Sequence, residues 1–160
     1  MDDAVTYRLA TLDDALSLCE LGQVLCDVHH AARPDIYAAP TEDFSRDLAH
    51  WSGRFEKAGQ VVFIAHAGLE AVAFITASLS ASSGPLMQPQ TVARVGSVCV
   101  AEAYWGQGIG RHLMGLVKNW ALDNDAQDLR LSVWSFNERA VRMYTELGFE
   151  RRALEMGMRL

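Results

Sequence analysis

One segment carries most of the structural and chemical information in this chain: Val100-Ala101-Glu102-Ala103-Tyr104-Trp105-Gly106-Gln107-Gly108-Ile109-Gly110-Arg111. It joins an apolar, β-branched run to an amphipathic helical pattern that continues to about Leu122. The glycines at Gly106, Gly108 and Gly110 let the main chain approach a ligand, while the first N–H groups of the helix point outward together. These donors and the positive end of the helix dipole favour a phosphate group. A plain turn with tight helix packing is the alternative explanation of the glycines.

The glycine spacing differs from that of two familiar phosphate motifs. A P-loop would need Lys followed by Ser or Thr after its last glycine, whereas Gly110 precedes Arg111 and His112. A dinucleotide fingerprint has Gly-x-Gly-x-x-Gly spacing early in a βαβ unit, and here the glycines alternate late in the chain. The segment therefore argues against mononucleotide hydrolysis and against a dinucleotide-binding unit.

Apolar periodicity on both sides of this segment predicts regular structure over most of the chain. The predicted strands span residues 5–9, 61–65, 72–76, 94–100 and 129–134, with a last strand after Phe149 through Met158. The predicted helices begin near residues 11, 41, 108 and 137 and end before Pro34 and near residues 57, 122 and 147. The order βααβββαβαβ indicates a mixed α/β (α+β) fold, with a mostly antiparallel sheet of six to seven strands flanked by four helices. We expect one domain over residues 1–160.

The composition limits the classes of partner that the chain is expected to bind. The chain has a formal charge of −6, which argues against nucleic acid because phosphate binding needs clustered Lys and Arg. No apolar run is long enough to span a bilayer, so no membrane partner is expected. The odd set of cysteines, Cys19, Cys26 and Cys99, lacks metal-ligand spacing, so we expect no metal and a reducing cytoplasm.

A second informative segment runs from Asn137 to Phe149. Asn137 lies at a natural helix N-cap position. Ala140, Tyr144 and Leu147 recur at steps of four and three, so they share a face that looks inward. Taken alone, this pattern is more often explained by core packing of a tyrosine with its hydroxyl satisfied than by catalysis.

Together and in this order, the two segments resemble the GNAT superfamily of acyl-CoA-dependent N-acetyltransferases. The family's acetyl-CoA motif reads Arg/Gln-x-x-Gly-x-Gly/Ala after the fourth strand, and a later Asn-x-x-Ala-x-x-x-Tyr-x-x-x-Gly-Phe pattern also belongs to it. The resemblance runs from the first strand and helix to the last strand and implies the family's fold, with acetyl-CoA as cosubstrate.

The resemblance also implies roles for residues at matching positions. Main-chain N–H groups of the glycine turn would bind the coenzyme A pyrophosphate, in the residues Gly106, Gln107, Gly108, Ile109, Gly110 and Arg111. The pantetheine arm would pair with the preceding strand, at Val98, Cys99 and Val100. That strand splays in the family from the one matching residues 129–134, which opens a wedge. Asn137 matches a residue that helps to hold the cofactor, and Tyr144 matches the acid that protonates the departing thiolate.

One position departs from the family motif. Trp105 stands where the motif has Arg or Gln, so that side-chain contact to phosphate is absent, and main-chain donors with Arg111 are expected to suffice. Acetyl transfer also needs a donor to the carbonyl oxygen, for which a main-chain N–H near Cys99 or Val100 is the candidate. Cys99 itself is not favoured as a nucleophile because no His/Asp partner is assigned to it.

The general base and the acceptor site rest on weaker signals. Glu102 is a candidate base, with a solvated loop carboxylate as the alternative. His30 and Tyr37 fall in the predicted loop between the first two helices, which in the family borders the acceptor pocket. Trp134 is a further candidate for this pocket, with core packing as the alternative.

The sequence thus predicts an N-acetyltransferase that passes acetyl from acetyl-CoA directly to a primary amine of a small molecule or peptide. The alternative is a non-catalytic acyl-CoA sensor on the same fold, which would not need Tyr144. A structural interaction domain would not be stabilised by coenzyme A. A monomer and a homodimer remain equally compatible with the sequence.

Overall fold

The computed structural model describes residues 4–55, 57–82 and 84–160. Its strands are β1 (Val5–Leu9), β2 (Gln60–Ala67), β3 (Glu70–Ser82), β4 (Gln90–Val100) and β5 (Asp128–Arg130). Its α-helices are α1 (Ala15–Ala32), α2 (Ser45–Ser52), α3 (Ile109–Asp123) and α4 (Glu138–Glu146). Short 3-10 turns lie at Leu12–Asp14 and Glu102–Tyr104. Within the described part of the chain, no helix has the length and apolar character to cross a membrane.

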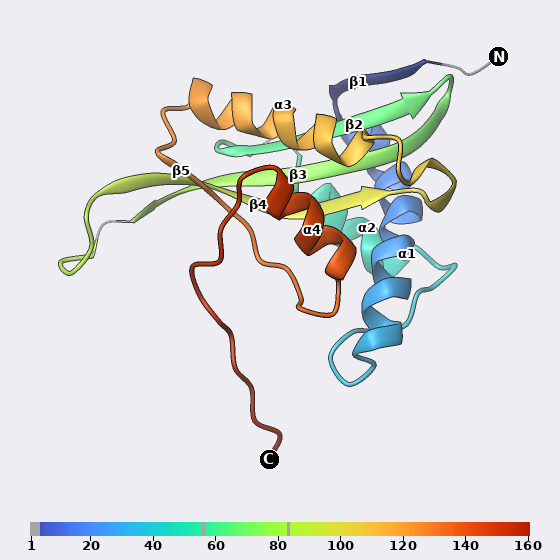
Figure 1. Ribbon diagram of the computed structural model, residues 1–160. Helices are drawn as coiled ribbons and strands as arrows, with labels where there is room; N and C mark the ends of the chain where they lie inside the picture. The colour runs from blue at the N-terminus through green and yellow to red at the C-terminus, as the bar shows by residue number, and fades with distance from the viewer. Residues whose placement is uncertain (1–3, 56, 83) are drawn as a thin grey trace.

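The strands form one sheet in the order β1-β2-β3-β4-β5 (Figure 1). The first four strands pair antiparallel, and among the described strands only β5 runs parallel to its neighbour β4. A two-residue turn joins β2 to β3, whereas α1 and α2 lie between β1 and β2. A helical crossover, α3, connects β4 to β5, as a parallel connection requires. The predicted mixed α/β fold with four helices is therefore confirmed.

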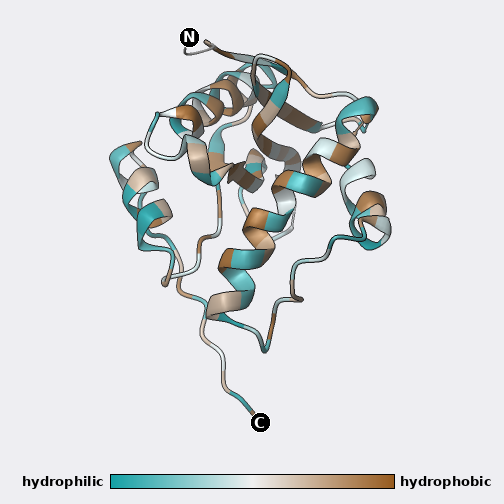
Figure 2. Cartoon of the chain, turned by 90° about the vertical axis from the view of Figure 1, so that its right-hand side faces the viewer, coloured by the Kyte–Doolittle hydropathy of each residue, from teal (hydrophilic) through white to brown (hydrophobic). Residues whose placement is uncertain are grey.

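Helices cover both faces of the sheet, and each face has its own apolar cluster (Figure 1). α3 packs on one face through Leu113 and Val117, which are fully buried. α1 and α2 pack on the other through Leu18 and Trp51, with Phe74 of β3 beneath them. Strand alternation produces this division, since successive side chains point to opposite faces. Figure 2 looks at the α1 side and shows hydrophobic and hydrophilic residues alternating along the helices.

A β-bulge interrupts β4 at Gly96. Thr76 of β3 pairs with Ser97 and Ala77 with Val95, which leaves Gly96 as the extra residue. The Thr76 hydroxyl accepts a hydrogen bond from the Ser97 N–H at 2.9 Å and so satisfies a donor at the bulge. A bulge bends its strand and increases its twist. The bulge at Gly96 lies two residues after Arg94, the last β4 residue that pairs with β5. The bulge therefore turns the end of β4 away from β5.

The predicted number of strands was wrong. The sheet has five strands rather than six to seven, because β5 stops at Arg130 and residues 150–160 pair with no described strand. Residues 131–134 and 150–160 both carry the alternation of a strand, but alternation becomes a strand only when a neighbour supplies hydrogen bonds. In Figures 1 and 2 the C-terminal segment extends away from the body.

Both ends of α2 differ from the prediction, and α1 includes two residues that were expected in the loop. α2 ends at Ser52 rather than near residue 57. α2 begins at Ser45 rather than near residue 41, since Asp43 accepts hydrogen bonds from the Ser45 N–H and hydroxyl in a local turn. α1 continues to Ala32, which places His29 and His30 in its last turn rather than in the loop. The Arg33 N–H closes this turn on His29 O at 2.8 Å.

Candidate active site

The chain's second half forms a fork between β4 and β5. The two strands pair only where Val92–Arg94 faces Asp128–Arg130. Beyond Arg94, β4 continues to Val100 with β3 as its single described neighbour. The predicted splay of these strands is therefore present, and it leaves one edge of β4 without a strand partner in the described chain.

Main-chain groups at the end of β4 alternate between β3 and this open edge. The Ala101 N–H donates to Val72 O at 2.8 Å, so Ala101 and Cys99 direct their main-chain groups to β3. Those of Val98 and Val100 consequently face the fork. The indole Nε1 of Trp105 donates to Val100 O at 2.7 Å, which occupies this carbonyl. The Val100 N–H is thereby the main-chain donor closest to the end of the open edge.

Cys99 points away from the fork into the other core. Its side chain is 2% exposed, and its Sγ donates to Leu21 O of α1 at 2.7 Å. Burial raises the pKa of the Cys99 thiol to about 12, so the thiolate does not form near neutral pH. Cys99 has a packing role, and a nucleophile at this position is excluded on chemical grounds.

The glycine turn between β4 and α3 leaves donors uncovered at the start of the helix. Gly106 and Gly108 have φ of 79° and 80°, a conformation that residues with a Cβ rarely adopt. At both positions the space around a built Cβ is empty within 4 Å. The first helical hydrogen bond runs from the His112 N–H to Gly108 O, so the N–H groups of residues 109–111 precede it. No acidic residue lies in this first turn, so the positive end of α3 is left to an anion.

The third glycine and its neighbour have a different role. A Cβ at Gly110 would lie 3.3 Å from Met143 Sδ, so this glycine lets α4 pack closely against α3. Arg111 forms an ion pair with Glu146 of α4, with both side chains about half exposed. Ile109 is buried in the sheet-facing core, while Gln107 is exposed. The segment thus combines an open turn with a helix start that α4 braces.

A cation that the sequence prediction missed lies beside this turn. The guanidinium of Arg139, in the first turn of α4, stacks over the Trp105 ring at 4.4 Å from its centroid. Trp105 is 39% exposed, so its ring forms an outer wall of the turn. Arg139 therefore supplies positive charge near the position where the family motif carries Arg or Gln. Nothing in the local sequence signals this contact, since it depends on how α4 packs.

Tyr144 joins the two predicted segments. It packs in the α3-side cluster together with Val98 and Val100 of β4, and its ring meets Phe149 edge-on at 5.8 Å between centroids. The Tyr144 hydroxyl makes no hydrogen bond with the described residues. It is also not one of the fully buried polar atoms without a partner, so the hydroxyl oxygen is accessible. Burial raises the pKa of Tyr144 above that of a free phenol. Tyr144 is therefore a protonated phenol at neutral pH, in the cluster that also includes Val98 and Val100.

Asn137 and Glu102 flank this region. The Asn137 Oδ1 accepts a hydrogen bond from the Ala140 N–H at 3.2 Å, which confirms its predicted position as the N-cap of α4. Glu102 begins the 3-10 turn two residues after Val100 and is exposed to solvent. The chain thus places a carboxylate within two residues of the fork, without burying it.

The three predicted acceptor residues lie together between the end of α1 and the segment after β5. His30 Nδ1 is 2.7 Å from Tyr37 O, and the Trp134 indole donates to the Tyr37 hydroxyl at 2.6 Å. His29 packs against the Tyr37 ring at 4.7 Å between centroids, and the Arg33 guanidinium lies over Trp134 at 5.3 Å. This acceptor-end cluster links the end of α1 to the segment after β5. His29 belongs to the segment that the sequence placed beside the acceptor pocket, whereas the sequence prediction missed Arg33 as a member of the contact set.

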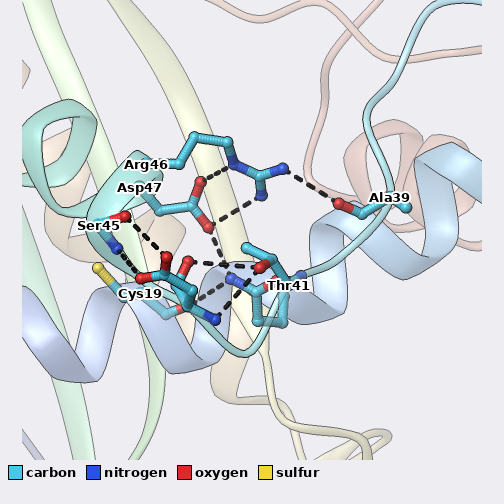
Figure 3. Close-up of polar contacts among 8 residues, drawn as sticks. Cys19, Ala39, Thr41, Ser45, Arg46 and Asp47 are labelled. Atoms are coloured by element: carbon cyan, nitrogen blue, oxygen red, sulfur yellow. Dashed lines mark hydrogen bonds and ion pairs between the residues drawn. The ribbon is translucent and has the colours of Figure 1, made fainter.

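A polar network fixes the loop that carries Tyr37 (Figure 3). Gln23 of α1 donates to Asp47 Oδ2 of α2 at 2.8 Å and accepts from the Thr41 N–H at 2.8 Å. Arg46 donates to Ala39 O at 3.2 Å and pairs with Asp47. The loop between α1 and α2 is therefore tied to both helices, so its position beside Trp134 is built into the fold.

Comparison with known proteins agrees with this geometry. A model of the acetyltransferase (GNAT) family matches residues 25–149. The tetramutant of the BH1408 protein from Bacillus halodurans superimposes with a TM-score of 0.88 at 24% identity, covering 97% of this chain and 99% of that one. A transcriptional regulator from Bacillus halodurans C-125 gives a TM-score of 0.79 at 20% identity, covering 98% and 100% of the two chains.

A third solved structure is the aminoglycoside N-acetyltransferase AAC(6')-Iy in complex with CoA. It superimposes with a TM-score of 0.78 at 16% identity, over 98% of this chain and 95% of that one. At these identities the structural likeness shows a shared fold. The family model spans most of the chain and includes the fork, the glycine turn and α4. The chain therefore belongs to the acetyltransferase (GNAT) family.

Proposed function

We propose that this chain, as one domain, transfers the acetyl group of acetyl-CoA to a primary amine by direct attack in a ternary complex, with Tyr144 as general acid. The observation that carries the proposal is the Tyr144 hydroxyl. It makes no hydrogen bond with the described residues, yet it belongs to the cluster that holds Val98 and Val100 at the fork. A tyrosine with only a packing role would gain stability by pairing its hydroxyl.

The glycine turn suits the pyrophosphate of coenzyme A. The main-chain N–H groups of residues 106–111 would bind it, because the empty space at Gly106 and Gly108 lets oxygen atoms approach the main chain. Arg139 adds a positive charge, while Arg111 is partly engaged by Glu146. Asn137 would help to hold the cofactor beside the N-terminus of α4. The open-edge groups of Val98 would pair with the amide-bearing arm, while the Val100 N–H would lie beside the acetyl end of the cofactor and Cys99 completes the strand.

Two groups of this chain would act on the reacting atoms. Bound acetyl-CoA supplies the acetyl thioester. The Val100 N–H, directed into the fork, would stabilise negative charge that develops on the carbonyl oxygen. Tyr144 would give its proton to the departing sulfur, since the raised pKa of Tyr144 keeps the phenol protonated while a thiol has a pKa of about 8.5. No covalent bond to the protein is needed.

The acceptor would enter from the acceptor-end cluster, past Tyr37 and Trp134, with His30 bracing the loop. A formal charge of −6 attracts ammonium groups to the protein. An ammonium must lose its proton before it attacks. The exposed Glu102 would take that proton, directly or through water. We infer that the acceptor is a small-molecule or peptide amine. We also infer that the protein is cytoplasmic and that Cys19, Cys26 and Cys99 stay reduced.

A non-catalytic acyl-CoA sensor is the second candidate. One of the similar folds is that of a transcriptional regulator, which favours keeping this alternative. A sensor and an enzyme would both bind coenzyme A at the glycine turn. Only the enzyme needs the Tyr144 proton, and Tyr144 is present.

The test has two steps. Thermal unfolding with and without coenzyme A should show stabilisation that grows with ligand concentration. Thiol release from acetyl-CoA should then be measured with a panel of amines that includes aminoglycosides, diamines and peptides with free amino groups. Binding with acceptor-dependent thiol release supports the enzyme. Binding without release from any amine would favour the sensor, and absence of both would exclude both functions.

A further inference from the structure

A cleft of about 390 Å³ lies between the first half of α1 and the start of β3. Its floor is apolar and comes from three parts of the chain: Leu21 and Val24 of α1, Ala71 of β3, and Ala101 just after β4. Leu21 is buried, and the other three side chains are half-buried. The volume is within the range of about 300–1,000 Å³ that is typical of small-molecule sites. The cleft can therefore hold a small ligand with an apolar part.

Two carboxylates line this cleft without a cationic partner. Glu20 comes from α1, and Glu70 is the first residue of β3. Both side chains are exposed, and neither forms an ion pair with another described residue. No Lys or Arg is among the described residues that line the cleft. The cleft thus combines an apolar floor with negative charge that the described chain leaves unneutralised.

This combination of features determines the class of ligand. The carboxylates of Glu20 and Glu70 would repel an anion, and a neutral apolar molecule would leave their charge without a partner. A metal ion is not favoured, because Ca²⁺ and Mg²⁺ take about six or more oxygen ligands and the described residues include no group of three or more potential ligands. An organic ammonium ion with an apolar chain matches both the floor and the charge.

We propose that the cleft binds a primary alkylammonium ion, with its ammonium group facing Glu20 and Glu70 and its alkyl chain over Leu21 and Val24. A primary amine is protonated at neutral pH, as the Lys side chain is, so it carries the charge that the carboxylates lack. The cleft is distinct from the acceptor-end cluster. Glu20 and His30 lie on the same helix, roughly 15 Å apart along its axis at about 1.5 Å per residue.

The end of β4 separates the cleft from the fork. The Ala101 N–H donates to Val72 O at 2.8 Å, so the main chain at Ala101 faces β3, whose first residues line the cleft. The main-chain groups of Val100 face the fork instead. An amine in the cleft therefore lies on the opposite side of β4 from the proposed chemistry. The cleft is a second amine site and not the acceptor site.

The test is isothermal titration of the whole chain, without acetyl-CoA, with primary amines from propylamine to hexylamine. Affinity should rise about three- to fourfold with each added methylene, because the apolar floor buries it. Hexanoate has the opposite charge and should bind at least about 10-fold more weakly than hexylamine. Glu20→Gln combined with Glu70→Gln should weaken hexylamine binding about 10-fold or more. The matched control, Asp123→Asn with Glu155→Gln, removes the same charge at exposed positions outside the cleft and should change the affinity less than about twofold.

Methyl NMR locates the bound amine, and circular dichroism verifies that each variant is folded. Hexylamine should shift the methyl resonances of Leu21 and Val24 in the unaltered chain and in the control, and should leave those of Leu131, outside the cleft, unchanged. No measurable hexylamine binding, or equal affinity in the variant that lacks both carboxylates and in the control, would refute the site. Methyl shifts confined to residues outside the cleft would also overturn it. None of these measurements contains acetyl-CoA, so failure of this site and failure of the proposed acetyl transfer are distinguishable.

Discussion

At the position where the family motif has Arg or Gln, Trp105 changes how the glycine turn is built. Its indole binds Val100 O and its ring carries the Arg139 guanidinium. One residue therefore fixes the end of β4 and brings a cation from α4 to the turn. A charge that the motif usually places in the turn itself is here delivered by tertiary packing.

This arrangement predicts that Arg139 contributes to coenzyme A binding. Arg139→Ala should raise the dissociation constant of coenzyme A about 3- to 10-fold, because a charge worth about 0.5–1.5 kcal/mol near the phosphates is lost. Arg142→Ala, on the same helix, is the control and should change the constant by less. Isothermal titration at low and moderate salt measures both. An Arg139→Ala constant equal to that of the parent would assign Arg139 to packing on Trp105 alone.

The proposed role of Tyr144 as general acid gives the most direct test of catalysis. Tyr144→Phe removes the proton and keeps the ring that meets Phe149, so kcat should fall about 100-fold or more while coenzyme A affinity stays within about twofold. Tyr104→Phe is the control, because Tyr104 packs in the same cluster and has no assigned proton transfer. Steady-state thiol release reports the rates. Because burial raises the pKa of Tyr144, its ionisation should not limit the parent rate below about pH 10.

Sequence reasoning identified residues whose roles are local and missed those that depend on packing. The Asn137 cap was predictable, because capping involves only the three following residues. The contact between Arg139 and Trp105 was not, because it joins positions on two elements whose approach is set by Gly110. Arg33 was missed for the same reason, since it meets Trp134 only when the loop folds back.

At the scale of elements, helices were more predictable than strands. A helix satisfies its main-chain groups within itself, so the periodicity of α3 and α4 predicted both within two residues of their bounds. A strand needs a neighbour, so the alternation over residues 129–134 gave only Asp128–Arg130 as β5. The open edge of β4 that forms the candidate site arises from this same unpaired region.

A substitution at the contact between α1 and α2 would show how tightly these two helices pack against each other. A Cβ at Gly22 would lie 2.9 Å from Trp51 Cζ2, closer than carbon atoms approach. Gly22→Ala should therefore lower the free energy of unfolding by about 1–3 kcal/mol, because Trp51 or α2 must shift. Gly115→Ala in α3 is the control, since its Cβ would meet open space, and it should be neutral or stabilising by up to about 1 kcal/mol.

Urea unfolding of both variants measures the difference. Equal stability of Gly22→Ala and Gly115→Ala would mean that α2 is loosely held against α1. That result would also weaken the inference that the Gln23 network positions the acceptor loop, because the network joins the same two helices.

In the whole molecule, the buried core and the candidate active site lie in different parts of the sheet. The four antiparallel strands and the helices on both faces hold the buried clusters. The fork, the glycine turn and α4 lie at the β5 edge of the sheet, where pairing stops (Figure 1). The open edge leaves main-chain groups without a strand partner among the described residues, and in the proposed function these groups pair with the cofactor.

The acid stability of the whole molecule should depend on the contact that anchors β1 to the start of α1. Arg8 donates to both oxygens of Asp14 at 2.8 and 2.7 Å, and the Thr11 N–H donates to the same carboxylate at 2.8 Å. These donors lower the pKa of Asp14 to about 2, against about 3.9 in the unfolded chain. The unfolded state then binds more protons, so stability from this group is complete above about pH 5 and lost as the pH falls towards 2.

Asp14→Asn should lower the free energy of unfolding by about 1–2 kcal/mol at pH 7, an amount reduced from the full linkage value because Arg8 is half exposed. The difference from the parent should shrink as the pH falls from about 5 towards 2 and vanish below pH 2, where the parent carboxyl is itself protonated. Asp13→Asn, which alters the exposed neighbour in the same turn, should show a much smaller effect. Urea titrations at a series of pH values measure all three proteins. A difference between Asp14→Asn and the parent that stays constant from pH 7 to pH 2 would mean that the Asp14 carboxylate contributes through its shape and not through its charge.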